Sequence, residues 1–307
     1  MTTDVPAGPR PPRVAVDALG GDHGPRVVVQ GAVQAARELG VHVRLVGPEA
    51  IVREELRRAA GEGLPIDVVV APEAIDMAEK VSRATLKKRS SILVALELVR
   101  DGEADAFFSA GNTAACWTIA KLTLGTLEEV TRPALAAALP RIDGRTVLID
   151  VGANADCDAR NLEEFAVMGK IYTRAVFHTP NPRVGLMSMG EEETKGSQLT
   201  REVHEVLKSS NLNFIGNVEG GDIFSGRVDV IVMDGFTGNV ALKASEKLAE
   251  SLVHLIREEL MRNPLRKLGA ALSRGAFAAV KHGIRVAAEF FTSGVNQKIE
   301  TELRALG

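Results

Sequence analysis

The sequence predicts an α/β protein with a mainly parallel β-sheet and helices on both faces, a three-layer α/β/α arrangement. Short runs rich in Val and Ile recur along the chain, often apolar on both faces, as buried parallel strands are. Amphipathic or compact apolar stretches of helical length separate these runs, and such alternation is typical of βα units. The 307 residues suffice to bury a core without disulfides or metals.

The expected elements follow this alternation. Strands are expected at 14–16, 43–46, 66–70, 106–108, 146–149, 184–187, 213–215 and 228–232. Helices are expected at 25–39, 91–99, 113–124, 161–177, 198–208 and 239–261. The first helix follows Asp22 and has Pro25 in its first turn, a common helix start. Composition places no domain boundary, but Pro133 and the apolar run at 135–138 mark an expected passage to a second lobe, where antiparallel strands are an option.

Composition narrows the classes of protein. A net charge of −3 and one Trp with one Tyr argue against a global nucleic-acid binder and a base-stacking platform. Two cysteines make neither a disulfide framework nor a cysteine zinc site, so each is expected to be a small core residue in a reducing cytoplasm. Residues 1–12 are Pro-rich, lack a signal-peptide core and predict a disordered tail. No apolar run approaches the ~20 residues that span a bilayer, so a cytoplasmic protein with at most peripheral membrane contact is expected.

Polar loops that contain glycine follow six of the expected strands. They lie at 17–22, 109–113, 150–154, 188–196, 219–222 and 234–239. Ligands of open α/β sheets bind outside the carboxyl ends of the strands, and successive N–H groups before a helix bind anions. Each loop alone is explained by the needs of a βα turn. The six together predict a site for a phosphate, a carboxylate or a carbonyl oxygen. No Walker, dinucleotide, zinc-protease or nucleophile-elbow motif is present, and the histidines show no metal-ligand spacing.

Single residues in these loops leave alternatives open. Lys195, the one cation among them, either neutralises a phosphate or oxyanion or pairs at the surface with a neighbouring glutamate at 191–193. Asparagines at helix starts either donate to a ligand or cap their helices, and they are Asn112, Asn154 and Asn239. Three aspartates lie in the same loops, Asp17, Asp22 and Asp234. The alternatives for them are to orient these donors, to hold a cation or to cap a helix.

A basic stretch lies near the C-terminus. Residues 260–288 hold six basic residues and no acidic one, with leucines interspersed. The basic residues assigned to a partner or membrane surface are Arg262, Arg266, Lys267 and Arg274. Such a stretch is typical either of a membrane-surface or acidic-partner site or of a solvated helix face. A second basic cluster, Arg83 with residues 87–89, offers an acidic partner another surface.

The loops and the strands before them contain several specific segments. These include VAVDALGGD (14–22), SAGNT (109–113), DVGANADC (150–157), GEEETKG (190–196), IGNVEGGD (215–222) and VDVIVMDGFTGNVALK (228–243). In these segments the chain resembles the phosphate acyltransferase (PlsX) family of bacterial phospholipid synthesis. The resemblance implies transfer of a fatty acyl group from acyl carrier protein to inorganic phosphate, giving acyl phosphate. It implies a two-lobed fold similar to phosphotransacetylases and isopropylmalate dehydrogenases. It also implies a homodimer at the membrane periphery, with contact to a glycerol-phosphate acyltransferase as an option.

With this resemblance the loops acquire roles. Catalysis is assigned to Lys195, Asn239, Asn112 and Asn154. Phosphate binding is assigned to Asp17, Gly20, Gly21, Asp22, Gly111, Thr113, Asp234 and Gly238. A phosphate oxygen would attack the thioester, and the thiol would leave without strong acid catalysis. No cofactor and no metal are expected.

The chain departs from the family pattern in two places. Gly221 stands where the family usually has arginine, and a glycine- and leucine-rich block that follows the basic stretch in the family is missing. A chain break or a rebuilt turn is therefore expected between 265 and 279. Two alternatives stay open: a dehydrogenase or decarboxylase that uses aspartates and Mg²⁺ on the same scaffold, and an inactive membrane-recruited scaffold.

Overall fold

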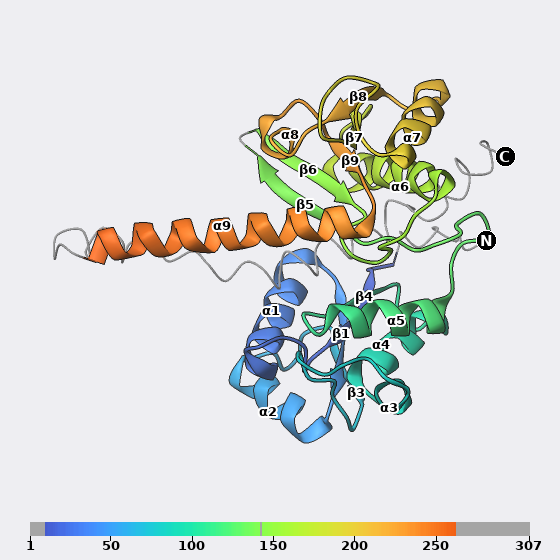
Figure 1. The fold of residues 1–307 in the computed structure, drawn as a ribbon. Coiled ribbons are helices and arrows are strands. Elements are labelled where there is room, and N and C mark those ends of the chain that lie inside the picture. Colours follow the sequence, from blue (N-terminus) through green and yellow to red (C-terminus); the bar gives the residue numbers. More distant parts are fainter. Residues whose placement is uncertain (1–9, 142, 262–307) are drawn as a thin grey trace, which may run out of the picture. The chain divides into compact units, whose positions relative to one another are not determined.

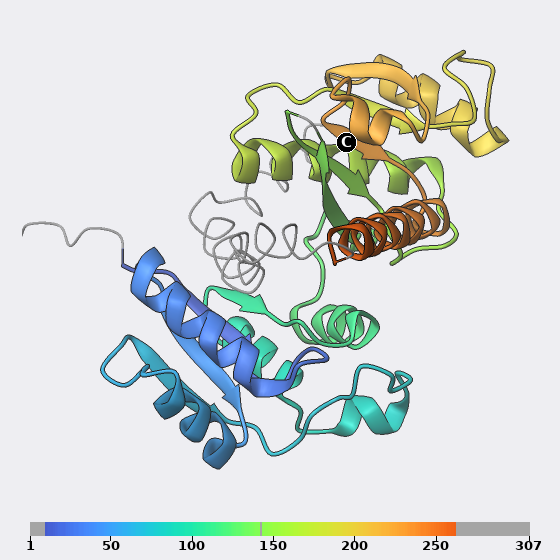
Figure 2. The ribbon, with the colours of Figure 1, turned by 90° about the vertical axis from the view of Figure 1, so that its left-hand side faces the viewer.

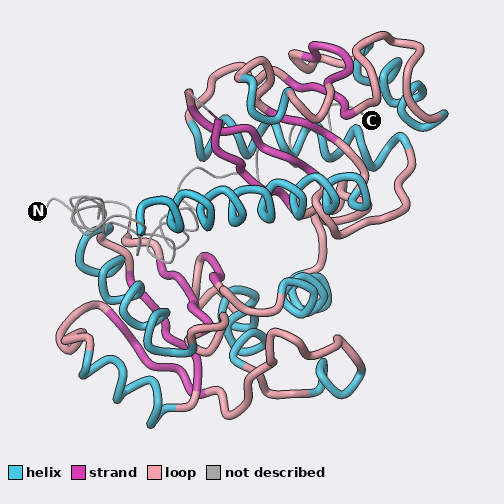
Figure 3. Tube along the Cα trace, turned by 60° about the vertical axis from the view of Figure 1, so that its left-hand side comes forward, coloured by secondary structure: helices cyan, strands magenta, loops and turns pink. Residues whose placement is uncertain are grey.

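A computed structural model describes residues 10–141 and 143–261, drawn as ribbon in Figure 1. Over these residues the chain divides into two compact units, one up to Gly125 and one from Thr126. Each unit holds its own sheet. In Figure 3 loops join the strands to the helices that follow them, which is the βα alternation of the sequence.

The first unit contains a fully parallel four-stranded sheet in the order β3-β2-β1-β4. Its strands are β1 (Arg13–Asp17), β2 (His42–Gly47), β3 (Ile66–Val70) and β4 (Ala106–Phe108). Its helices are α1 (Gly24–Leu39), α2 (Glu49–Arg58), α3 (Arg83–Lys87), α4 (Ser91–Arg100) and α5 (Thr113–Leu124). Side chains alternate along a strand, so Val14 and Val16 of β1 pack with α1 while Ala15 packs with α4. The sheet is therefore covered on both faces, with α1 and α2 on one side and α4 on the other (Figure 1).

The second unit contains a five-stranded sheet in the order β5-β6-β9-β7-β8, in which only β5 is antiparallel. Its strands are β5 (Ala136–Arg141), β6 (Gly144–Ile149), β7 (Val184–Met187), β8 (Phe214–Val218) and β9 (Val230–Val232). Its helices are α6 (Ala159–Phe177), α7 (Gln198–Ser209), α8 (Asp222–Ser225) and α9 (Gly235–Met261). Figure 2 shows β5 and β6 as a pair of green arrows.

The same alternation gives this sheet two covered faces. Val147, Ile149 and Val230 pack with α6 and α7. Leu148 and Ile231 point to the other face, where α8 and the first turns of α9 cover them. Past these turns α9 projects beyond the sheet of its own unit (Figure 1).

The predicted fold class is confirmed: the structure is three-layered α/β with mainly parallel strands. The antiparallel strand left as an option near Pro133 is present as β5, although no strand was expected at 136–141. Helix α2 and the short helices α3 and α8 were not predicted, and the last two strands run over 214–218 and 230–232 instead of 213–215 and 228–232.

The chain is already anchored at residue 10, within the stretch assigned to a tail. The Arg10 guanidinium donates to the Asp105 carboxylate at 2.5 Å, and the Pro12 carbonyl accepts from the His42 amide at 2.9 Å. Within 10–141 and 143–261, none of the helices combines the length and the apolarity needed to cross a bilayer. The basic stretch after Met261 and the expected break at 265–279 lie outside the described residues.

Candidate active site

In the first unit the loops after β1 and β4 meet, because these two strands are parallel neighbours. Asp17 is 2% exposed, and its carboxylate accepts from the Leu19 amide at 3.1 Å and from Ser109 Oγ at 2.7 Å. Ser109 Oγ in turn accepts from the Gly111 amide at 2.9 Å. Asp17 thus joins the two loops from inside the protein, and its assignment to phosphate binding stays a prediction.

Two glycines at this junction disfavour a side chain, Gly20 through lack of room and Gly21 through its backbone conformation. A Cβ at Gly20 would lie 2.8 Å from both Asp17 Oδ2 and the Gly111 nitrogen. Gly21 has φ +95°, which is the left-handed region that favours glycine. The predicted phosphate-binding glycines are therefore required first by the packing of one loop on the other.

Asn112 is buried, and both polar atoms of its side chain are engaged. Oδ1 caps α5 by accepting from the Ala115 amide at 3.1 Å. Nδ2 donates to the carbonyls of Met77 and Glu79 at 3.0 and 2.9 Å. Asn112 holds the segment 76–79 against the start of α5, whereas Asp22 and Thr113 are exposed.

In the second unit, Asp150 organises the loop after β6. Its carboxylate is fully buried and accepts from the amides of Leu135, Gly152, Ala153 and Asn154 at 2.7–3.1 Å. The Asn154 side chain donates to Asp150 and to the Pro133 carbonyl, both at 2.9 Å. Sequence reasoning did not single out Asp150, although an aspartate at a strand end before Gly-x-Asn was the signal for it.

The start of α9 packs against this loop. Asp234 accepts from the Thr237 amide at 2.8 Å and hydroxyl at 2.7 Å, and so caps the helix. The Gly235 amide donates to the Asn154 carbonyl at 2.8 Å, and a Cβ on Gly238 would overlap the Asp150 carbonyl oxygen. The Asn239 side chain is exposed, and a Cβ on Gly152 would lie 3.7 Å from its Oδ1. Asn239 is thus the solvent-facing polar group of this junction.

Lys195 lies on the loop after β7. Its side chain is exposed, and it makes no ion pair among the described residues. Two of its three acidic neighbours have other partners, since Glu191 pairs with Arg227 and Glu193 pairs with Lys208 at 2.8 Å. Of the two alternatives for Lys195, the surface pair with an adjacent glutamate is not formed, and its ammonium group is available to an anion.

The six polar loops lie at the carboxyl ends of the strands of two separate sheets, and each such end is called a sheet edge below. One edge, in the first unit, holds Asp17, Gly20, Gly21, Gly111 and Asn112. The other holds Asn154, Lys195, Asp234, Gly238 and Asn239, because β6, β9 and β7 are adjacent and parallel. The expectation of one cleft shared by Asn112, Asn154 and Asn239 stays a prediction. The basic residues Arg262, Arg266, Lys267 and Arg274 lie outside the described residues.

The part of the chain that the structure describes contains no cluster of three or more His, Cys, Asp or Glu residues arranged to hold a metal. The exposed asparagine, Asn239, and Lys195, which has no ion pair among the described residues, both lie at the carboxyl ends of the strands of the second unit. Such groups suit binding of an anion and stabilisation of developing negative charge.

Comparison with known proteins identifies relatives along almost the whole chain. The family model of the fatty acid synthesis protein matches residues 12–289. A phosphate acyltransferase from Acidobacterium capsulatum is 45% identical, covering 95% of this chain and 97% of its own. One from Aquifex aeolicus is 42% identical, covering 96% and 97%.

Solved structures share the fold at low identity. EutD phosphotransacetylase from Staphylococcus aureus has a TM-score of 0.57 at 17% identity, over 78% of this chain and 83% of its own. A branched-chain phosphotransacylase from Enterococcus faecalis has a TM-score of 0.51 at 15% identity, over 76% and 83%.

Proposed function

Because the chain belongs to the phosphate acyltransferase family, we propose that it moves a fatty acyl group from acyl carrier protein to inorganic phosphate, and so forms acyl phosphate for phospholipid synthesis. The main structural support for the site is that Lys195 is exposed and makes no ion pair among the described residues. It lies at the same sheet edge as the exposed Asn239.

In the proposed reaction a phosphate oxygen attacks the thioester carbonyl carbon. The new C–O bond forms as the C=O electron pair moves to oxygen, and the tetrahedral intermediate collapses by breaking the C–S bond. The sulfur leaves with the bonding electrons and takes a proton from solvent. A thiol has a pKa of about 8.5, so this leaving group needs little help from an acid.

The residues have separate roles in this proposal. The Lys195 ammonium group neutralises the phosphate and then the developing oxyanion. Asn239 is the side-chain donor, since its amide faces solvent at the start of α9. Asn112 and Asn154 act through the loops they hold, because their amide hydrogens already bind carbonyl and carboxylate oxygens. The phosphate-binding amides are those of the glycine-containing loops that do not already donate within the protein, as the amides of Gly111 and Gly238 do.

The same proposal includes the setting of the enzyme. We expect a homodimer in the cytoplasm that meets the membrane peripherally, where it passes acyl phosphate to a glycerol-phosphate acyltransferase. Leu248, Leu252 and Leu255 are exposed on α9, and the basic residues of 260–288 follow them in the sequence. Exposed leucines followed by cations suit an anionic membrane surface or an acidic carrier protein.

The test is phosphate-dependent formation of acyl phosphate from acyl carrier protein by the purified chain. Lys195→Ala should lower kcat/KM by about 10²-fold or more, the range found when one oxyanion-stabilising group is removed. Lys247→Ala is the matched control, because this lysine on α9 is 73% exposed and pairs with Glu250 on the same helix. A wild-type chain without product would overturn the activity, and a folded Lys195→Ala variant with the wild-type rate would remove the lysine from the site.

A further inference from the structure

We infer that Asn217 and His204 are positioning residues for Lys195, acting through the backbone carbonyl of Glu192. The inference rests on the proposed role of Lys195 in binding phosphate. Neither residue belongs to the loops that carry the proposed chemistry: Asn217 lies on β8 and His204 on α7.

The Glu192 carbonyl oxygen receives two hydrogen bonds. One comes from the backbone amide of Lys195 at 2.9 Å and closes the turn 192–195. The other comes from Asn217 Nδ2, also at 2.9 Å. Asn217 is 1% exposed, so the turn is attached to the sheet by a buried donor. Apart from this turn, the loop between β7 and α7 has no regular secondary structure to fix it.

The orientation of the Asn217 amide is fixed by its neighbours. A carbonyl oxygen only accepts, so Nδ2 must face Glu192, and Oδ1 therefore faces the His204 ring. His204 Nδ1 lies 2.9 Å from that oxygen and carries the proton of this bond. The ring is 3% exposed and packs edge-on against Phe214, with centroids 5.2 Å apart. His204 thus holds Asn217, which holds the turn.

The apolar surroundings of His204 and Asn217 indicate that these two polar residues have a role other than packing. The neighbouring positions of the core, Val203, Leu207 and Leu186, are apolar and fully or almost fully buried. Buried polar groups cost stability unless they are hydrogen-bonded, and an apolar pair would fill this site without that requirement. What the polar pair adds is contact with the turn before Lys195: Asn217 donates to the Glu192 carbonyl, and His204 Nε2 lies 3.6 Å from the Glu193 carboxylate. Both His204 variants below lose the second contact, so they differ only in the bond to Asn217.

A second contact sets the direction of the lysine side chain. A Cβ on Gly190 would lie 3.0 Å from Lys195 Cγ, so the aliphatic stem of Lys195 passes closely over this glycine. The turn fixes the backbone of Lys195 and the glycine admits its stem. The ammonium group then needs little further ordering when it meets an anion.

The test uses two variants of His204 that differ in one hydrogen bond. In His204→Asn the amide nitrogen takes the place of Nδ1 and keeps the donor, whereas His204→Leu loses it. Asn217→Asp is a third variant, which keeps the acceptor for His204 and replaces the donor to Glu192 with a carboxylate oxygen. Unfolding midpoints identify the variants that fold.

Two measurements on the full chain then decide. Hydrogen exchange of the Lys195 amide, without substrate, should accelerate in His204→Leu and Asn217→Asp and stay near wild type in His204→Asn. The first two should raise KM for inorganic phosphate and lower kcat/KM by about 10- to 100-fold, since small misplacements of a catalytic group cost up to about 10²-fold. His204→Asn should retain most of the activity.

A double-mutant cycle separates this inference from the proposed function. In a Lys195→Ala background, His204→Leu should cause no further loss of rate, because both act on one group. Equal losses in both backgrounds, unchanged exchange in folded His204→Leu, or no difference between the two His204 variants would each overturn the inference. If Lys195→Ala alone keeps the wild-type rate, the proposed site fails, and the exchange measurement still decides whether His204 and Asn217 hold the turn.

Discussion

At the scale of single residues, burial raises the pKa of the Cys116 and Cys157 thiols to about 11. For Cys116 a hydrogen bond with Ser109 opposes this rise and the charge of Asp17 adds to it. For Cys157 a hydrogen bond with the Gly235 backbone opposes it. A thiol is a nucleophile only as its thiolate, so neither side chain is suited to carry the acyl group as an enzyme thioester. This favours direct transfer to phosphate.

We predict that both thiols of the folded chain resist iodoacetamide at pH 8. The thiolate fraction falls on the order of 10²-fold when the pKa rises from about 8.5 to about 11, and labelling slows accordingly. Labelling should accelerate about tenfold per pH unit up to pH 11. The unfolded chain in guanidinium serves as the control and should label at both positions. Rapid labelling of either thiol in the folded protein would contradict the prediction.

The three asparagines show what residue-level sequence reasoning can reach. Each follows a strand and precedes a helix, so capping and ligand binding were equally open to Asn112, Asn154 and Asn239. The structure separates them through partners that lie far away in the chain, such as Met77 for Asn112 and Pro133 for Asn154. No local pattern contains these partners. Sequence therefore found the polar loops but not which of their side chains remain free.

At the scale of elements, the contact between β6 and α9 gives a sharp prediction. Gly238→Ala should destabilise the protein by about 1–3 kcal/mol, because its Cβ would overlap the Asp150 carbonyl oxygen and push α9 away from the loop after β6. This opposes helix propensity, which favours Ala over Gly by about 1 kcal/mol. Gly220→Ala is the control, since a Cβ there meets nothing within 4 Å. Chemical denaturation compares them, and equal stability of the two variants would refute the packing argument.

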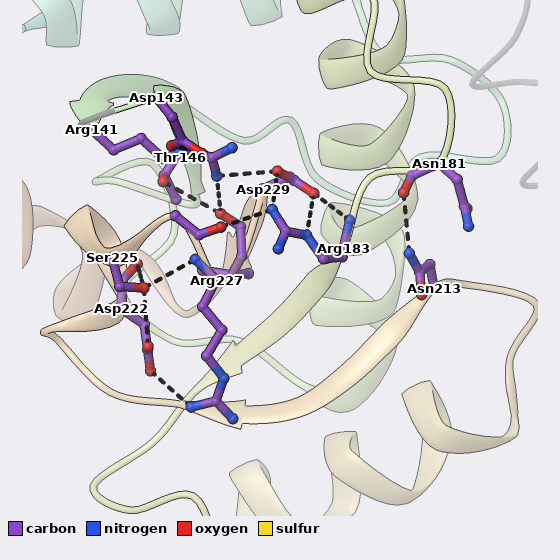
Figure 4. Close-up of polar contacts among 12 residues, drawn as sticks. Arg141, Asp143, Thr146, Asn181, Arg183, Asn213, Asp222, Ser225, Arg227 and Asp229 are labelled. Atoms are coloured by element: carbon purple, nitrogen blue, oxygen red, sulfur yellow. Dashed lines mark hydrogen bonds and ion pairs between the residues drawn. The ribbon is translucent and has the colours of Figure 1, made fainter.

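The buried carboxylate of Asp229 links three strands of the second unit's sheet, at the amino ends of its parallel strands (Figure 4). Asp229, before β9, accepts from Arg183, before β7, at 2.9 Å and lies 3.1 Å from Arg141 of β5. Burial alone would raise the pKa of Asp229. The hydrogen bonds from Arg183 and Arg141 outweigh it and lower that pKa below its usual range. The ionised form is therefore the one the fold stabilises.

We predict that Asp229→Asn lowers the free energy of unfolding by about 3 kcal/mol at pH 7, because the buried Arg141 loses its buried charge partner and keeps only the ion pair with the exposed Asp143. A carboxylate with a lowered folded-state pKa contributes stability above its unfolded value of about 3.9, and this is lost as pH falls through the folded-state pKa. The difference between variant and wild type should therefore shrink below pH 4. Urea titrations at pH 7 and pH 3.5 measure it, and a pH-independent difference would exclude the ionic contribution.

The elements that sequence missed have physical reasons of their own. Helix α2 buries only Val52 and Leu56, so its apolar pattern is sparse, and Glu–Arg pairs such as Glu49 with Arg53 were the available signal. Strand β5 contains Pro140 and several alanines, which are depleted in strands, but it lies at the edge of its sheet, where proline is tolerated. Strands such as β1 and β9 were found because they are rich in Val and Ile and buried on both faces.

At the scale of the whole molecule, periodicity indicated parallel strands but not how many sheets they form. Strand order depends on pairing between distant segments, such as β1 with β4 and β6 with β9. Six strand-end loops were therefore expected at one edge, whereas the structure distributes them over two edges in two units. The argument that loops share one site therefore applies to the loops of one sheet at a time.

Charge is distributed unevenly along the chain. The net charge is −3, and residues 260–288 contribute +6, so the remaining residues carry −9 (−3 minus 6). An acidic protein is repelled by an anionic membrane, and attraction must come from a local basic segment. This segment follows α9, whose exposed Leu248, Leu252 and Leu255 supply apolar area beside it in the sequence.

We predict that the full chain binds vesicles containing anionic lipid and that salt weakens this binding, since the Debye length falls to about 8 Å at 0.15 M. Each Lys or Arg near such a surface contributes about 1 kcal/mol, so Arg266→Glu with Lys267→Glu should lower the affinity by at least about 30-fold. The matched control is Arg53→Glu with Arg57→Glu, the same charge change on exposed residues of α2. If both pairs weaken binding equally, net charge and not the basic segment governs it. If neither pair changes the affinity for vesicles or for acyl carrier protein, residues 260–288 form a solvated surface without a partner.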